Sequence, residues 1–204
     1  MNLLKLLAHL SGSDAPAAAT RRTSLSRLAQ AGAAALPAAL TALLATSAQA
    51  RPSATTYDAL RLALLLAYLQ RELYTRVLTK PDAFFGPATT KAAIQTMLGH
   101  EQQQATLLED VLRNSGGALP AKPAFDFTGS KNGRQAAIFP DVFDNFDTFL
   151  QVAQLLEDAG VRAYKGQVEF LAADNYLLET ALRIHATQAR HAALVRTLRR
   201  QRGA

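Results

Sequence analysis

The sequence predicts an all-α protein, a bundle of four long helices with one long crossover between the second and the third helix. Three observations support this prediction. Four segments after residue 55 repeat apolar residues every three or four positions, and no segment sustains the two-residue alternation of a β-strand. One link of about 25 residues, 115–139, interrupts the series, whereas the other links are short. Short links join antiparallel neighbours, so the crossover makes the two middle helices parallel.

The first two helices have clear start and stop signals. The first is expected over about 56–79, where Pro81 stops it, because proline cannot continue a helix. The second is expected over about 88–114, since Pro87 suits a helix start and the glycine pair at 116–117 suits its end.

The third and fourth helices are bounded by charged residues as well. The third is expected to start near Pro140 and to end near Gly166, and acidic residues in its first turns suit the helix dipole. The fourth is expected to start at Asp174 or Asn175, which are both good N-cap residues. Its last turns are rich in arginine, which we interpret as a solvated helix end rather than a binding patch. The acidic residues are Asp141, Asp144 and Asp147, and the arginines are Arg199, Arg200 and Arg202.

Composition and charge exclude several classes of protein. Cysteine is absent from the 204 residues, which excludes disulfides, thiolate metal sites, cysteine nucleophiles and iron–sulfur ligation. The formal charge is +6, but residues 51–204 hold 18 basic and 15 acidic residues. Because this part is only mildly basic, a nucleic-acid partner is not expected.

The first fifty residues have the pattern of an export signal. A basic pair, Arg21-Arg22, precedes an Ala-rich apolar stretch at 29–45, and Ala48-Gln49-Ala50 has the small residues of a cleavage site. We therefore divide the chain into a signal peptide, 1–50, and one domain, 51–204.

The route of export is left with three alternatives. The basic pair favours twin-arginine translocation, although Ser24 and Ser26 replace the usual neighbours of that signature. The general secretory route and an uncleaved anchor are the others. Pro37 and the small residues around it make a poor permanent span, so no stable membrane span is expected after cleavage. The expected location is the periplasm or the cell envelope.

Polar residues interrupt the apolar stripes of the predicted helices at matching heights. Residues three, four and seven positions apart share one face of a helix, so these side chains should project into the core. They are Glu101 and Gln104 in the second helix, Glu157 in the third, and Gln188 and His191 in the fourth. A buried unpaired charge costs several kcal/mol, roughly, so a metal ion or a closed hydrogen-bond network must accompany them.

The motifs around these residues resemble those of di-iron ferritin-like proteins, over about residues 55–200. The residues in these motifs are also similar to those of exported bacterial ferritin-like proteins of the desiccation-related group. Such centres use a single Glu on each of two helices and Glu-x-x-His on each of the other two. The corresponding segments here are Ala67 to Tyr74, Glu101 to Gln104, Glu157 to Tyr164, and Gln188 to His191.

The resemblance implies a degenerate centre. Three of the six expected ligands are present, namely Glu101, Glu157 and His191. Three are replaced, by Ala67, Gln104 and Gln188, and the losses fall mostly on one half of the site. The expected cofactor is therefore none, or one divalent ion of iron, manganese or zinc held by the three surviving residues.

Three states of the centre stay open at this point: a working two-metal centre, a single-metal site and a metal-free polar core. In the polar core, the two glutamines would hydrogen-bond to the carboxylates, His191 would supply the counter-charge, and Tyr74 or Tyr164 would donate hydrogen bonds. His100 and His185 are expected to flank the inner faces rather than to take part.

The function expected from the resemblance is an exported, non-catalytic ferritin-like protein associated with stress or desiccation. The alternative is a metalloprotein or oxidoreductase that uses one metal ion at Glu101, Glu157 and His191. Only a short polar tail follows Leu198, so we expect no cage but a monomer or a homodimer. No nucleotide-binding or hydrolase motif is present, and the sequence identifies no physiological partner.

Overall fold

A computed structural model describes residues 56–116 and 118–203, and the expected signal peptide lies outside these residues. The described residues form four long helices and one short helix, and they contain no β-strand. The helices are α4 (Thr56–Val77), α5 (Asp82–Phe85), α6 (Ala88–Asn114), α7 (Phe146–Leu171) and α8 (Asn175–Gln201). The predicted all-α class is therefore confirmed.

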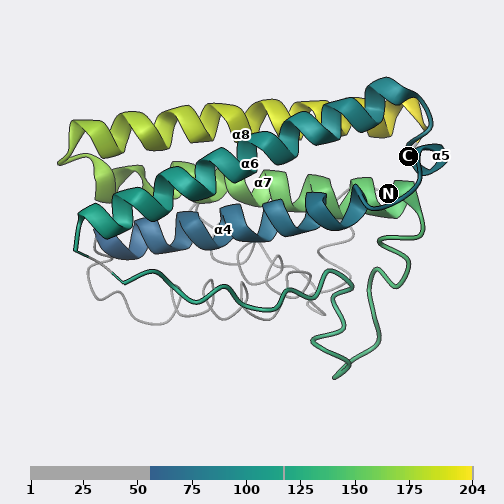
Figure 1. The fold of residues 1–204 in the computed structure, drawn as a ribbon, viewed down its shortest axis with the longest axis horizontal. Coiled ribbons are helices and arrows are strands. Elements are labelled where there is room, and N and C mark those ends of the chain that lie inside the picture. Colours follow the sequence, from purple (N-terminus) through teal and green to yellow (C-terminus); the bar gives the residue numbers. More distant parts are fainter. Residues whose placement is uncertain (1–55, 117, 204) are drawn as a thin grey trace, which may run out of the picture. The chain divides into compact units, whose positions relative to one another are not determined.

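The four long helices form the predicted bundle (Figure 1). Helix α4 packs along α6 and α7, and α8 packs along α7 most extensively of all. The two middle helices, α6 and α7, run in the same direction, as the long crossover predicts. Among neighbouring long helices, α6 and α8 contact each other least.

The start of the third long helix was predicted about six residues too early. Residues 140–144 form turns rather than a continuous helix, although Asp144 and Asn145 both donate backbone hydrogen bonds to Asp141. Asn145 then adopts an extended conformation and caps α7, since its side chain accepts from the backbone N–H groups of residues 147 and 148. An asparagine that satisfies two free N–H groups fixes the helix start more strongly than the preceding proline. The helix also continues past Gly166 to Leu171.

An aromatic cluster closes one end of the bundle and includes the short helix α5, which the sequence patterns did not predict. Phe84 and Phe85 of α5 both pack edge-on against Phe146 at the start of α7. Phe146 stacks on Phe149, whose ring meets Tyr74 of α4 edge-on at 6.2 Å between centroids. The cluster therefore holds Tyr74 firmly where it faces the interior of the bundle.

Within the crossover, residues 124–138 belong to a compact unit separate from the helices. Asp126 organises this segment, because its carboxylate accepts hydrogen bonds from Thr128, Ser130 and the backbone of Asn132. Burial alone would raise the pKa of Asp126, but these hydrogen bonds outweigh it and lower the pKa to about 2.

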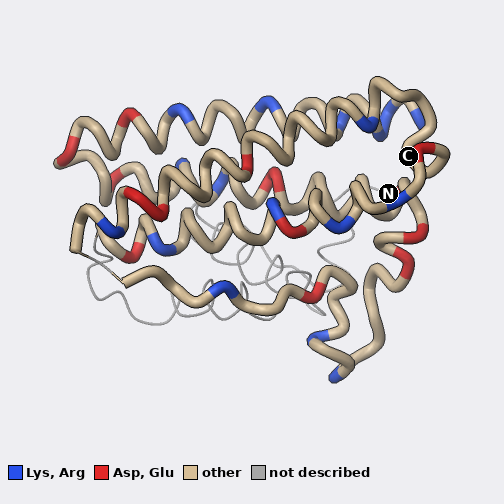
Figure 2. The backbone as a smooth tube through the Cα atoms, in the orientation of Figure 1, with Lys and Arg blue, Asp and Glu red and all other residues tan. Residues whose placement is uncertain are grey.

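Several arginines near the end of α8 bind neighbouring side chains, whereas the sequence predicted a solvated helix end. Basic residues gather along the last turns of α8 (Figure 2). Three of them bind side chains of α7, in the pairs Arg196 with Asp158, Arg199 with Gln154, and Arg202 with Asp147. No helix among the described residues has the length and apolar character needed to cross a membrane.

Candidate metal centre

The three predicted site residues converge inside the bundle, one from each of three helices. Glu101 comes from α6, Glu157 from α7 and His191 from α8, and the side chains are 0%, 0% and 4% exposed. One ligand-type atom from each lies within 4.8 Å of the other two. Helical spacing places each residue on the inner stripe of its helix. The packing of the helices then brings the three side chains to the same level of the bundle.

His191 stands between the two carboxylates. Its Nδ1 atom lies 3.1 Å from Oε1 of Glu101 and 3.6 Å from Oε2 of Glu157. Neither contact has hydrogen-bond geometry, and Nδ1 of His191 has no other partner. The second oxygen of Glu101 and Oε2 of Glu157 are also buried without a hydrogen bond. Three buried ligand atoms from three helices thus lack a hydrogen-bond partner in the protein.

These separations fit one metal ion. Histidine nitrogen and carboxylate oxygen bind zinc at about 2.0–2.2 Å, which places neighbouring ligand atoms about 3–3.5 Å apart. The contacts of His191 with the two carboxylates lie close to this range. Two anionic oxygens and one neutral imidazole form a donor set that suits a divalent ion of iron, manganese or zinc.

Tyr74 orients Glu157 from the opposite side. Its hydroxyl donates a hydrogen bond of 2.5 Å to Oε1 of Glu157, which confirms the expected role of Tyr74. Of the two tyrosines expected as alternative donors, Tyr164 takes a different partner, because its hydroxyl donates to the backbone carbonyl of Ala63 at 3.5 Å. Burial and the nearby carboxylates raise the pKa of both tyrosines well above the ordinary value, so both hydroxyls stay protonated donors.

Three glutamines occupy the other half of the centre. Nε2 of Gln70 donates to Oε1 of Gln188 at 2.7 Å. Nε2 of Gln188 in turn donates to Oε1 of Glu101 at 3.0 Å, with a weaker contact of 3.3 Å to Oε1 of Gln104. The expectation that glutamine would hydrogen-bond to a carboxylate is thus confirmed for Gln188, whereas Gln104 binds another amide instead. We call Gln70, Gln104 and Gln188 the amide half of the centre.

Gly160 of α7 makes room for the amide half. A Cβ atom at this position would lie 2.3 Å from Oε1 of Gln188 and 3.4 Å from Nε2 of Gln70. Such overlap with a buried hydrogen-bonded amide would displace the side chain of Gln188. The observed position of the Gln188 side chain therefore requires glycine at position 160.

The amide half does not fit a second metal ion. Ala67, fully buried on α4, offers no ligand atom where the family pattern has a carboxylate. The oxygen and the nitrogen of the Gln188 amide are both hydrogen-bonded to protein side chains. Nε2 of Gln104 is a hydrogen-bond donor without a partner. Neutral amides are much poorer ligands for these ions than carboxylate or imidazole. The residues present thus fit one ion and not two.

His100 is a component of the centre that the sequence reasoning missed. Its Nδ1 atom lies 2.9 Å from Nε2 of His191, and the two rings stack within 9° of parallel. A hydrogen bond at Nε2 fixes the orientation of the His191 ring, as outer partners do for metal-binding histidines. A signal was available, since Met97, His100 and Gln104 also follow a three-and-four spacing. Gln70 was missed in the same way between Ala67 and Tyr74.

The charges of the centre are strongly coupled. Burial raises the pKa of Glu101, and the Glu157 carboxylate adds to this effect, so that the value reaches about 7 despite the contacts with His191 and Gln188. Burial lowers the pKa of His191, but its contacts with the two carboxylates outweigh this and raise the value to about 9. Burial and the neighbouring charge of His191 lower the pKa of His100. Without a metal ion, a protonated His191 supplies the counter-charge for the carboxylates.

Comparison with known proteins agrees with this architecture. The ferritin-like domain family matches residues 55–201, which include all four long helices and every residue of the centre. No curated protein and no solved structure matches the chain. Because the family match covers most of the chain, the protein belongs to the ferritin-like family.

Proposed function

We propose that the protein is a ferritin-like protein with a degenerate centre, which binds one divalent metal ion and performs no two-metal chemistry. The observation that carries the proposal is the set of three ligand atoms without hydrogen bonds, contributed by Glu101, Glu157 and His191. Native proteins leave few buried polar atoms unsatisfied, so one such atom on each of three side chains that converge in the core points to a ligand.

The proposed ion would neutralise the two carboxylates and join three helices. Glu101, Glu157 and His191 would hold it, while Tyr74 and His100 would orient Glu157 and His191 from outside. A bound divalent ion supplies Lewis acidity or, if it is iron or manganese, one-electron redox chemistry. Two-metal oxygen chemistry needs a second ion a few ångströms away, and the amide half provides no ligands for one.

A metal-free polar core is the second candidate, and specific contacts favour it as well. Tyr74 and Gln188 each donate to one of the two carboxylates, and the raised pKa of His191 makes it a cation at neutral pH. In that case the centre is a structural network, and the protein has no metal-dependent role.

A thermal melt separates the two candidates. Full-length protein freed of metal should gain several degrees in Tm with at least one of Fe(II), Mn(II) and Zn(II). His191→Ala should abolish this gain, whereas His185→Ala should retain it, because His185 lies outside the centre. The absence of any shift with all three ions would reject the metal site and support the polar core.

We also propose that the protein acts outside the cytoplasm and is associated with desiccation or another stress. The support is the twin-arginine-like pair and the Ala48-Gln49-Ala50 site, together with the likeness of its motifs to exported desiccation-related proteins. Mature protein should begin at Arg51, which N-terminal sequencing of the fractionated cell would test. Lysine at both Arg21 and Arg22 should block export if the twin-arginine route is used, and unimpaired export would indicate the general route.

A further inference from the structure

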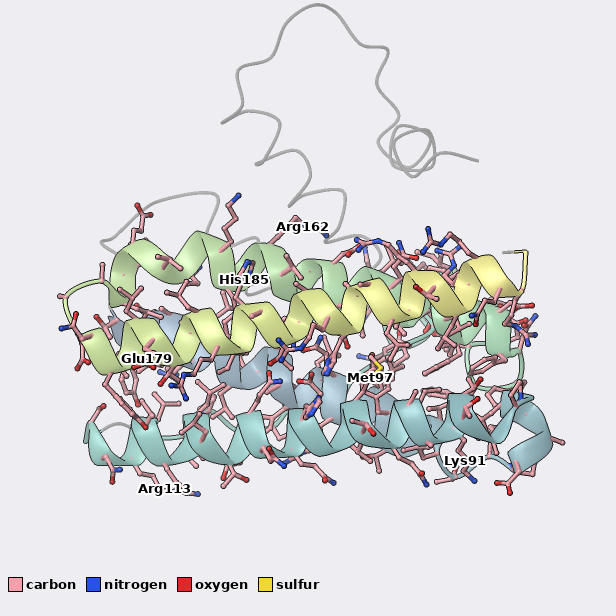
Figure 3. All side chains as sticks on the ribbon, turned by 90° about the horizontal axis from the view of Figure 1, so that it is seen from above. Lys91, Met97, Arg113, Arg162, Glu179 and His185 are labelled. Carbon is pink, nitrogen blue, oxygen red and sulfur yellow. The ribbon has the colours of Figure 1, made fainter. Side chains whose placement is uncertain are left out.

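A groove runs between the two long helices that contact each other least. It lies between α6 and α8 and has a volume of about 490 Å³. Glu179 lies on the side of α8 that faces α6 (Figure 3). The lining includes His100, Gln103 and Gln104 from α6, and Glu179, Arg183 and Thr187 from α8.

The inner end of this groove reaches the buried centre. His100 lines the groove and also bonds to His191, and Gln104 lines it and contacts Gln188. His191 and Gln188 are themselves 4% and 0% exposed. His100 and Gln104 therefore lie between the groove and the buried side chains of His191 and Gln188.

Part of the groove lining can bind a hydrated cation, beside the apolar side chains of Leu107 and Ile184 and the ion pair of Arg183 with Glu179. Amide, hydroxyl, carboxylate and imidazole groups can replace the water molecules of a divalent ion one at a time. Another cavity, between α4, α7 and α8, is apolar and has a volume of about 20 Å³, and its lining includes Leu60, Leu66 and Ile184. Transfer of a charged ion through such a narrow apolar space has a prohibitive desolvation cost.

We infer that the groove between α6 and α8 is the access route by which a divalent metal ion reaches Glu101, Glu157 and His191, and that His100 is the side chain that moves aside at its inner end. This inference rests on the proposed metal site. It goes beyond that site by assigning the path of the ion to the groove and the control of the uptake rate to His100, which is outside the ligand set.

The absence of cysteine from the sequence makes a direct test possible. Gln103 lines the groove, whereas its neighbour Gln102 is also exposed on α6 and does not line it. Gln103→Cys and Gln102→Cys in the full-length chain can each be alkylated after folding, either with iodoacetamide or with a bulky polycyclic maleimide. The two positions form a matched pair in residue type, helix and exposure.

Uptake of Co(II) into metal-free protein, followed by visible absorption in a stopped-flow instrument, gives the rate. The bulky label at position 103 should slow uptake at least tenfold relative to the small label, while the equilibrium affinity stays within a factor of about two. Both labels at position 102 should leave the rate unchanged. His100→Ala should accelerate uptake, because it removes the gate.

The outcomes distinguish the route from the site. Equal uptake rates for both labels at position 103, or slower uptake by His100→Ala, would overturn the access route and leave the metal site intact. If the unlabelled chain binds no Co(II), Fe(II), Mn(II) or Zn(II), the proposed function fails and the route fails with it.

Discussion

The two halves of the buried centre satisfy their polar atoms in different ways. Glu101, Glu157 and His191 bring charge into the core, and each leaves one ligand-type atom without a hydrogen bond. The amide half is neutral and is linked by the bonds of Gln188 to Gln70 and, more weakly, to Gln104. Gln70 and Gln104 also have one unpaired atom each, but a neutral amide is far cheaper to bury than a charge.

If the centre is degenerate, as proposed, this difference explains how the loss of one metal position is compatible with the fold. An amide in place of a bridging carboxylate removes a buried charge and adds a donor, so Gln188 can bond to the remaining Glu101. The space it needs comes from Gly160. The charged half cannot neutralise its charges through hydrogen bonds between its own side chains alone. Its stability should therefore depend on protonation or on a bound metal ion.

The largest effect should come from breaking the charged half. In metal-free protein at pH 7, His191→Ala should lower the free energy of unfolding by about 3–5 kcal/mol, since it leaves two buried carboxylates without their cation. Urea denaturation measures this change. His185→Ala provides the control, and an equal loss in both variants would mean that the charge of His191 is unimportant.

A companion variant separates charge from packing. Replacing Glu101, Glu157 and His191 together by leucine removes every buried charge and should recover most of the stability lost by His191→Ala. A triple variant that is less stable than the single one would show that the residues are held by shape rather than by electrostatics.

The pH dependence should be the next largest effect. The folded-state pKa values of Glu101, about 7, and His191, about 9, both exceed those of the unfolded chain. Stabilisation by these groups is therefore complete at low pH and is lost as the pH rises from the ordinary pKa of each group through its folded value, about 7 for Glu101 and about 9 for His191. Chemical denaturation of metal-free protein between pH 5 and 9 tests this. The lowered pKa of Asp126, about 2, contributes nothing to this window.

A bound metal ion should reverse this trend. The ion replaces the protons of the centre, so its affinity should rise with pH. Stability that rises with pH in the metal-free protein would contradict the proposed coupling of Glu101 and His191.

Two glycines of α7 test the amide half with the same substitution. Gly160→Ala should cost about 1–3 kcal/mol, because the added methyl group overlaps the side chain of Gln188. Gly166→Ala should stabilise by about 0.5–1 kcal/mol, because nothing lies within 4 Å of the new methyl group and alanine favours the helix. Thermal melts of both variants, converted to free energies, measure the difference. Equal effects would mean that Gln188 has room to move.

The smallest effect is expected at Gln104. Gln104→Leu removes only a weak 3.3 Å contact and one unpaired donor, so the free energy of unfolding should change by less than about 1 kcal/mol. Urea denaturation beside His191→Ala compares the halves directly. A loss above about 3 kcal/mol at Gln104 would show that the amide half is as dependent on its polar contacts as the charged half.

The sequence predicted the bundle and the ligand cluster because both follow from helical periodicity. Glu101, Glu157 and His191 replace apolar residues on inner stripes, so a period near 3.6 is enough to bring them together. Periodicity was less informative at the edges of the stripes, where His100 was assigned to a flanking position and Gln70 was not singled out. Whether such a residue turns inward depends on the neighbouring helix, which periodicity does not describe.

Local capping explains the remaining difference. Pro140 and the acidic residues after it suit a helix start, but Asn145 provides a stronger one. The choice between two valid caps depends on how Phe146 packs against α5. That contact joins residues about sixty positions apart, which no local pattern can predict.

Metal stoichiometry of the full-length protein tests the central claim most directly. Metal-free protein, titrated separately with Fe(II) under anaerobic conditions and with Mn(II) and Zn(II), should bind one ion per chain with at least one metal by native mass spectrometry. The same titration of His191→Ala should give none. Two ions per chain would contradict the assignment of Ala67, Gln104 and Gln188 as lost ligands, and no binding of any ion would contradict the metal site itself.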